Sequence, residues 1–225
     1  MFQIDKNTRR LTKDEINQYD EDGYITGLPV FSSEAKYDLD KLFINLSSRI
    51  DNSIDLNKTA QWHKASLMFY NLCTTPQILD YVEDLLGPDF VLWGGQFFLK
   101  EPQDGSVVPW HQDIQYWPLK PAKAVTVWLA LYDTDEENGA MRIVRGSHKG
   151  EMFKHHTNDA KNLVLDQEVS DDQINKDDIV SLNLKVGQIS LHDDGLLHGS
   201  LPNNSDRRRC GITMRFSPVN VKVDL

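Results

Sequence analysis

Residues 90–102, FVLWGGQFFLKEP, mark the place where the hydrophobic period of this chain changes from that of helices to that of strands. Six further short runs with strand-like patterns follow: VVPWHQDIQYW (107–117), AVTVWLALYDT (124–134), AMRIVRGSH (140–148), DIVSLNLKVGQISL (178–191), LLHGSLP (196–202) and RCGITMRFSP (209–218). Turn-forming segments such as EENG and PNNSD separate them. Short runs with regular turns predict an antiparallel β core over about residues 90–218.

The chain before this core has a helical pattern, over about residues 10–88. Thr12 followed by Glu15 fits a capping box, and Pro76 and Gly87 bracket a second amphipathic stretch. Helices followed by a run of strands predict an α+β fold that is mainly β, a β-sandwich or jelly roll with the N-terminal helices packed on one sheet. We expect one domain over residues 1–225, with the acidic, weakly periodic segment 150–178 as a lid-like loop.

Composition restricts the partners of the protein. The 225 residues carry a formal net charge of -10, which argues against nucleic acid and anionic membranes. The sequence also lacks an apolar run near the roughly twenty residues that span a bilayer. The beginning of the chain is too polar for a signal peptide, so we expect a cytoplasmic monomer or homodimer that acts on a small molecule. The two cysteines, Cys73 and Cys210, are expected to be buried thiols.

Two His-x-Asp pairs compete as a metal site: His111 with Asp113, and His192 with Asp194. A non-haem iron(II) site needs two histidines and one carboxylate on one face of the metal, and its third ligand comes from a distant strand. His198 lies only four residues after Asp194, whereas several strand-like runs separate it from Asp113. This separation favours His111, Asp113 and His198 as the ligands and leaves His192 as a structural or pocket-lining residue.

An arginine accompanies the third ligand. Arg209 begins the strand-like run after His198 and Ser200, and alternation places its side chain on the same face as that of Thr213. A guanidinium is always charged and can hold a carboxylate through two parallel hydrogen bonds. These residues together are much less expected by chance than a single His-x-Asp.

Three segments, WHQDIQYWPL, VTVWLALYDTDEENGAMRIVRGSHKG and HGSLPNNSDRRRCGITMRF, resemble the phytanoyl-CoA dioxygenase-like branch of the iron(II)/2-oxoglutarate-dependent oxygenases. With LTKDEINQYDEDGYI, which looks like the family's opening helix, the resemblance runs from about Leu11 to about Pro218. It implies a double-stranded β-helix of the cupin-like type, with iron(II) bound by the triad His111, Asp113 and His198. It also implies that Arg209 and Ser200 bind the far carboxylate of 2-oxoglutarate and that Trp128 lies beside this co-substrate.

By the same resemblance Gln96, Phe98 and Lys100, which share one strand face, contact co-substrate or substrate. The activity it implies is hydroxylation of an unactivated C–H bond with O2, in which 2-oxoglutarate is released as succinate and CO2. Asp113 favours hydroxylation over halogenation, because related halogenases have Gly or Ala there. The chain shows no basic surface for the phosphates of coenzyme A, so a small, polar metabolite is expected in place of an acyl-CoA.

Two other functions remain open from the residues. A non-catalytic jelly-roll binding protein would keep the fold without turnover, and a cupin-like metalloenzyme without 2-oxoglutarate would give Arg209 no role. Simple alternation further predicts that His111, Asp113 and Gln115 share one strand face. Among the remaining aromatic and histidine residues, we expect Trp110, Tyr116 and Trp117 in the core, and His63, His155 and His156 at the surface.

Overall fold

The computed structural model describes residues 2–51 and 53–224. Within them the α-helices are α1 (Lys13–Asp22), α2 (Lys36–Ser47), α3 (Trp62–Ala65), α4 (Leu67–Cys73) and α5 (Pro76–Leu86). The strands are β1 (Tyr24–Pro29), β2 (Phe90–Lys100), β3 (Val108–His111), β4 (Leu119–Lys120), β5 (Val125–Ala130), β6 (Met141–Val144), β7 (His155–Thr157), β8 (Gln167–Val169), β9 (Ile179–Ser181), β10 (Gln188–Asp193), β11 (His198–Ser200), β12 (Arg209–Pro218) and β13 (Lys222–Val223). None of the helices described is long and apolar enough to cross a membrane.

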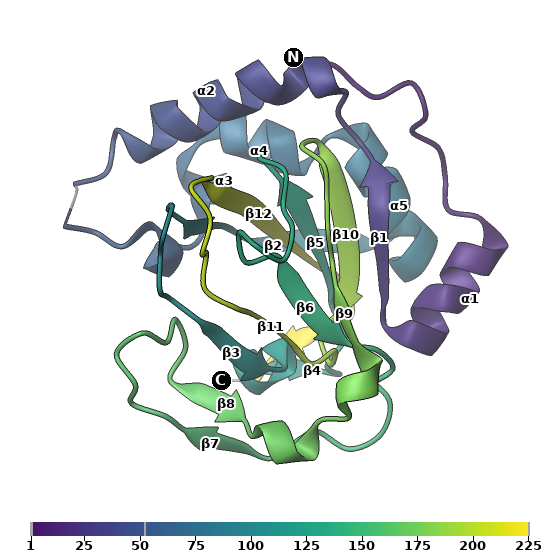
Figure 1. Cartoon of the computed structure of the whole chain (residues 1–225). Coiled ribbons are helices and arrows are strands. Elements are labelled where there is room, and N and C mark those ends of the chain that lie inside the picture. Colours follow the sequence, from purple (N-terminus) through teal and green to yellow (C-terminus); the bar gives the residue numbers. More distant parts are fainter. Residues whose placement is uncertain (1, 52, 225) are drawn as a thin grey trace.

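Two antiparallel sheets form the β core (Figure 1). The larger has the order β1-β10-β5-β12-β2, and the smaller has the order β3-β11-β6-β9. Strands distant in sequence are neighbours in both sheets, as β1 and β10 show. The predicted α+β fold with a jelly-roll core is confirmed. β7 and β8 form a separate two-stranded sheet at the end of the molecule opposite α2 (Figure 1).

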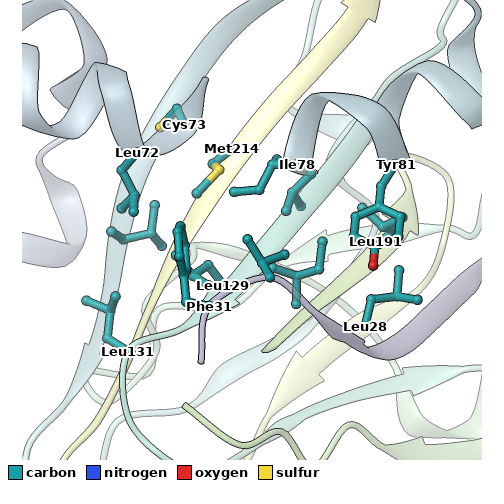
Figure 2. Packing of buried hydrophobic residues seen from close by; sticks show 14 of the residues in the cluster. Leu28, Phe31, Leu72, Cys73, Ile78, Tyr81, Leu129, Leu131, Leu191 and Met214 are labelled. Atoms are coloured by element: carbon teal, nitrogen blue, oxygen red, sulfur yellow. The ribbon is translucent and has the colours of Figure 1, made fainter. Parts of the chain in front are cut away.

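The main hydrophobic core lies between the N-terminal helices and the outer face of the larger sheet (Figure 2). The helices α4 and α5 contribute Leu72, Cys73, Ile78 and Tyr81 to it. Alternation along β12 turns four side chains to this face, Cys210, Ile212, Met214 and Phe216, all nearly fully buried. Each such aliphatic or aromatic side chain contributes about 1.5–3 kcal/mol on burial. The predicted buried thiols are confirmed for Cys73 and Cys210.

The helix boundaries follow the predicted local signals. Thr12 and Glu15 form the reciprocal capping box at the start of α1, and Gly23 ends that helix in a left-handed conformation. Pro76 occupies the first turn of α5, where its missing N–H is not needed. These caps fix the ends of the helices, whose apolar residues pack on the outer face of the larger sheet. The inner face of this sheet forms a pocket with the smaller sheet.

The structure differs from the prediction at two places. β3 ends at His111, and Asp113–Gln115 form a 3₁₀ turn, so the prediction that His111, Asp113 and Gln115 share a strand face was wrong. The turn forms because the backbone N–H of Tyr116 donates to the carbonyl of Asp113. The segment 150–178 is not a structureless loop either, because it contains β7, β8 and two 3₁₀ turns.

Candidate active site

Two of the predicted metal ligands face each other across the smaller sheet. The register of β11 against β3 pairs His198 directly with His111, and their ring centroids are 4.1 Å apart. The Nδ1 atom of each ring lies 2.9 Å from a backbone carbonyl, that of Pro109 for His111 and that of Leu196 for His198. A ring that donates from Nδ1 keeps the lone pair of Nε2 for a metal ion.

Asp113 completes the group. Its Oδ1 atom lies 3.7 Å from Nε2 of His111 and 4.0 Å from Nε2 of His198, and Thr126 donates a hydrogen bond of 3.3 Å to its Oδ2 atom. Burial alone would raise the pKa of Asp113, but the neighbouring imidazoles and the charge of Arg215 hold it well below its usual range. Burial lowers the pKa of His198 well below its usual value, followed in effect by the charge of His111. An ionised carboxylate and a neutral imidazole are the protonation states that bind a metal.

The three side chains therefore fit iron(II). One ligand atom from each of His111, Asp113 and His198 lies within 4.8 Å of the others, and all three residues are buried. Two imidazole nitrogens and one carboxylate oxygen on one side of a shared point form the donor set of the facial triad. Within the described residues, this is the one group of such side chains close enough to hold a metal ion.

Arg209 lies in the same pocket and fits a carboxylate. Its side chain is almost fully buried, and its Cζ atom lies 4.9 Å from the centroid of the Trp128 ring. Within residues 2–51 and 53–224, the Nε atom of Arg209 and the hydroxyl of Ser200 have no hydrogen-bond partner. Burial lowers the pKa of Arg209 to about 10, so the group is still a cation at neutral pH. A buried cation without a counter-charge is costly, and an anionic ligand would relieve this cost.

Three residues of β2 were predicted to contact co-substrate or substrate, and the structure places only one of them in the pocket lining. Phe98 lines the pocket, whereas Gln96 and Lys100 do not. The ammonium group of Lys100 donates to the carbonyls of Ser106, Ser200 and Leu201, and burial lowers its pKa to about 7, with a further lowering by Arg209. The Gln96 amide donates to the carbonyl of Asn57. A direct contact of Lys100 or Gln96 with co-substrate stays a prediction.

The two residues of the competing pair, His192 and Asp194, also lie in different surroundings. His192 lines the pocket, with its Nε2 atom 3.9 Å from Oδ2 of Asp113, whereas Asp194 is buried outside the pocket lining. Burial raises the pKa of Asp194 to about 8, followed in effect by the charge of Asp193. A carboxyl group that is mostly protonated at neutral pH is a poor metal ligand, in agreement with the preference for Asp113.

Several aromatic and histidine residues lie elsewhere than predicted. His63 is buried, and His155 is half-buried and accepts a hydrogen bond from the backbone N–H of Gln112, so the expectation of surface positions was wrong for both. Trp110 is in a core cluster, as predicted. Tyr116 and Trp117, in contrast, are only half-buried and lie outside the core clusters.

Alternation along the sheet also indicates pocket residues that were not predicted. Arg209, Gly211, Thr213 and Arg215 occupy successive inward positions of β12, yet only Arg209 and Thr213 were recognised. A Cβ atom at Gly211 would lie 2.1 Å from Cζ2 of Trp128, so glycine makes room for the indole ring that covers Arg209. Arg215 and Thr126 are cross-strand partners, and both line the pocket.

The segment 150–178 is held against the turn that carries Asp113. The side chain of Gln112 accepts from the backbone N–H of Phe153 and donates to the carbonyl of Gly195. The hydroxyl of Tyr116 donates to the carbonyl of Gln167. Gln112 itself does not line the pocket, as expected for the residue between two ligands. These bonds connect the lid-like segment to the turn that carries Asp113, and that turn to the loop before His198.

Comparison with known proteins identifies the family of the chain. A family model described as "Phytanoyl-CoA dioxygenase (PhyH)" matches residues 19–211, which include every candidate ligand. The chain belongs to the phytanoyl-CoA dioxygenase family. Two similar relatives are "Probable alpha-ketoglutarate-dependent hypophosphite dioxygenase" of Stutzerimonas stutzeri, 31% identical over 152 residues, and "Phytanoyl-CoA dioxygenase, peroxisomal" of Bos taurus, 29% identical over 158 residues.

The matches cover 67% of this PhyH family chain in both cases, but only 53% of the Stutzerimonas protein and 46% of the bovine protein. The chain thus spans about half the length of these curated relatives. Among solved structures, the apo form of "non-heme monooxygenase; ThoJ" has a TM-score of 0.78 at 27% identity and covers 92% of this chain and 78% of its own.

Proposed function

We propose that this chain is an iron(II)- and 2-oxoglutarate-dependent dioxygenase that hydroxylates an unactivated C–H bond of a small, polar metabolite. The observation that carries the proposal is the presence in one pocket of the triad His111, Asp113 and His198 and of the buried Arg209, whose Nε atom has no hydrogen-bond partner among the described residues. A metal site alone would fit a cupin-like metalloenzyme, but a co-substrate with a distal carboxylate also gives the arginine a partner. The names of similar proteins, which include alpha-ketoglutarate-dependent dioxygenases and an L-proline trans-4-hydroxylase of Streptomyces griseoviridis, support this choice.

Each side chain of the pocket has a defined part in this chemistry. The carbonyls of Pro109 and Leu196 fix the tautomers of His111 and His198, and Thr126 binds Oδ2 of Asp113 so that Oδ1 faces the two imidazoles. Iron(II) bound there would supply the site at which O2 is reduced while 2-oxoglutarate is converted to succinate and CO2. Arg209, stacked on Trp128, would anchor the distal carboxylate and so fix the position of the co-substrate.

Burial favours this chemistry because it keeps water away from the reacting groups. His111, Asp113 and His198 are each less than a tenth exposed. The lid-like segment contributes to this exclusion through its bonds to Gln112 and Tyr116. Substrate carbon and oxidant must be held within about 3–3.5 Å for selective hydrogen abstraction, so the walls of the pocket decide which carbon reacts.

The proposal is tested by mixing the protein with iron(II) and 2-oxoglutarate without oxygen. A weak visible charge-transfer band should appear, and an Arg209→Ala variant should need much more 2-oxoglutarate to produce it. Once oxygen is admitted, a metabolite screen should detect succinate release. A band that is absent, or that is unchanged in Arg209→Ala, would contradict the proposed role of 2-oxoglutarate. Substrate-stimulated activity that persists without 2-oxoglutarate would favour a cupin-like metalloenzyme.

A further inference from the structure

The pocket contains a second arginine for which the proposed co-substrate has no use. Arg215 lies on the same inward face of β12 as Arg209, six residues later, so their Cα atoms are separated by about 20 Å. Both residues line the pocket that holds the triad. No carboxylate oxygen lies within 4.0 Å of the Arg215 guanidinium among residues 2–51 and 53–224, and its buried Nε atom has no hydrogen-bond partner there. Its neutral contacts are a bond of 3.4 Å to Oε1 of Gln96 and the Trp117 ring.

The two arginines differ in access to solvent. Arg209 is 3% exposed, Thr213 is 5% exposed, and Arg215 is only partly buried. The inward face of β12 therefore runs from a closed end at Arg209 to a more open end at Arg215. A co-substrate anchored at Arg209 fills the closed end, so a molecule that binds afterwards meets Arg215.

Charge balance points to an anion at the open end. Iron(II) and the dianion 2-oxoglutarate cancel one another, and the single carboxylate of Asp113, which feels the charge of Arg215, offsets only one of the two arginines. One positive charge of the pair Arg209 and Arg215 then remains without compensation in the loaded pocket. The whole chain has an excess of acidic residues, 34 Asp and Glu against 24 Lys and Arg, so this positive charge is a local feature of the pocket. A single carboxylate on the substrate would balance it.

The surroundings of Arg215 also fit a small organic acid. The guanidinium lies over the Trp117 ring, with Cζ 5.2 Å from the centroid, and Trp93 packs edge-on against Trp117 at 4.8 Å. The Trp117 ring and the side chain of Gln96 limit the positions open to the guanidinium, and its remaining N–H groups can donate to a ligand. An arginine fixed in this way selects a planar, two-oxygen acceptor, and the two half-buried indoles provide apolar surface beside it.

We propose that Arg215 binds the carboxylate of a substrate that has a single carboxylate group and is thereby a specificity-determining residue of the reaction. The inference rests on the proposed 2-oxoglutarate-dependent function. It narrows the substrate from a small, polar metabolite to an organic acid or amino acid whose reacting carbon lies between its carboxylate and the metal. The 1-carboxylate of 2-oxoglutarate has the same chemistry as this ligand, and the experiment below separates the two sources.

The test uses the full chain loaded with iron(II) and 2-oxoglutarate without oxygen. Its probes are small monocarboxylates, each paired with its primary amide: phenylacetate with phenylacetamide, N-acetylglycine with N-acetylglycinamide, and the common neutral amino acids with their amides. Calorimetry measures binding of each probe, and the visible band measures binding of 2-oxoglutarate. In the unmodified protein at least one acid should bind on the order of 10- to 100-fold more tightly than its amide.

Arg215→Gln should remove this preference for the acid and leave the 2-oxoglutarate concentration for half-maximal band intensity within about twofold. Arg215→Lys should keep part of the preference, because lysine retains the positive charge but lacks the paired N–H donors of the guanidinium. Arg142→Gln is the matched control, since Arg142 also stacks on a tryptophan, Trp110, but does not line the pocket. It should keep the full preference.

Three results would overturn the inference. The first is a preference for the acid that survives in Arg215→Gln, and the second is a set of probes in which no acid binds more tightly than its amide. The third is a tenfold or larger loss of 2-oxoglutarate affinity in Arg215→Gln. The last would assign Arg215 to the 1-carboxylate of the co-substrate. Failure of the proposed function is recognised separately, because the unmodified protein would then show no visible band with any probe.

Discussion

The substitution Gly211→Ala tests the contact between Trp128 and Arg209, the arginine proposed to bind 2-oxoglutarate. Gly211 is the third residue of β12 and pairs with Phe98 of β2 and Ala130 of β5. A Cβ atom there would lie 2.1 Å from Cζ2, 2.3 Å from Cε2 and 2.5 Å from Cη2 of Trp128. Ordinary van der Waals contact begins near 3.4 Å, so the indole ring would have to move by about an ångström or more. Trp128 is 3% exposed, and Arg209 lies against its ring, so this movement disturbs the arginine.

Two quantities should change. Overpacking of this kind costs about 1–3 kcal/mol of the free energy of unfolding, and each kcal/mol lowers the melting temperature of a chain of this size by about 2–4 °C. Loss of the Arg209–Trp128 stacking, worth about 0.5–2 kcal/mol, should weaken 2-oxoglutarate about 2- to 30-fold. Urea unfolding measures the first effect, and anaerobic titration of the visible band measures the second.

The control is Gly105→Ala, because Gly105 is exposed and a Cβ atom there would have no neighbour within 4 Å. Trp128→Phe in the Gly211→Ala background should recover part of the lost stability, since phenylalanine lacks the indole atoms that the new methyl group strikes. A double-mutant cycle would give that coupling. The reasoning is refuted if Gly211→Ala unfolds at the same urea concentration as the unmodified protein and binds 2-oxoglutarate equally well.

Three further predictions concern the metal, the lid-like segment and pH. Asp113→Gly should abolish hydroxylation and weaken the binding of iron(II), measured by anaerobic metal titration. The loss of affinity should exceed the roughly 10- to 100-fold that a lost outer-shell partner costs. An unchanged affinity would contradict the ligand assignment. Gln112→Ala removes the hydrogen bonds to Phe153 and Gly195. Amide hydrogen exchange should therefore accelerate in residues 150–178, and the free energy of unfolding should fall by about 1–3 kcal/mol. Unchanged exchange in this segment would refute the role of Gln112 in holding it. Burial lowers the folded-state pKa of Lys100 to about 7, below the unfolded value of about 10.4, so the unfolded chain binds more protons between these values and stability should rise with pH. Urea unfolding from pH 7 to 8.5 should show a smaller rise for Lys100→Met, and an equal rise would contradict the shift.

The sequence predicted the features that depend on period and on local caps. Alternation along residues 209–218 separated Arg209 from Cys210 correctly, because both faces of β12 are buried and the register admits no slip without reversing them. The same rule, applied for two more positions, indicates Gly211 and Arg215. Neither was predicted, because a glycine has no side chain to indicate a function and the resemblance gives Arg215 no role, although the segment that carries the resemblance contains it.

Alternation failed where local hydrogen bonds replace the ladder. After His111 the chain turns, and the backbone N–H of Ile114 donates to the carbonyl of Asp194 in the loop before His198. That bond joins the turn that carries Asp113 to the loop before His198 and links residues far apart in sequence, so no local pattern contains it. The reach of Lys100 to three carbonyls is likewise set by tertiary structure, although its strand face was predicted.

The unpaired groups of the pocket connect these observations to the chemistry. Arg209, Arg215, Ser200 and His192 all present buried nitrogen or oxygen atoms without partners among the residues described. A fold selected for stability alone would pair such groups or replace them with apolar side chains, since each costs about 1–3 kcal/mol or more. They lie around one pocket, and the outer face of the same sheet is apolar and closely packed. The inner face therefore carries a cost in stability that metal, co-substrate and an anionic substrate would each relieve, so their binding should raise the melting temperature in turn.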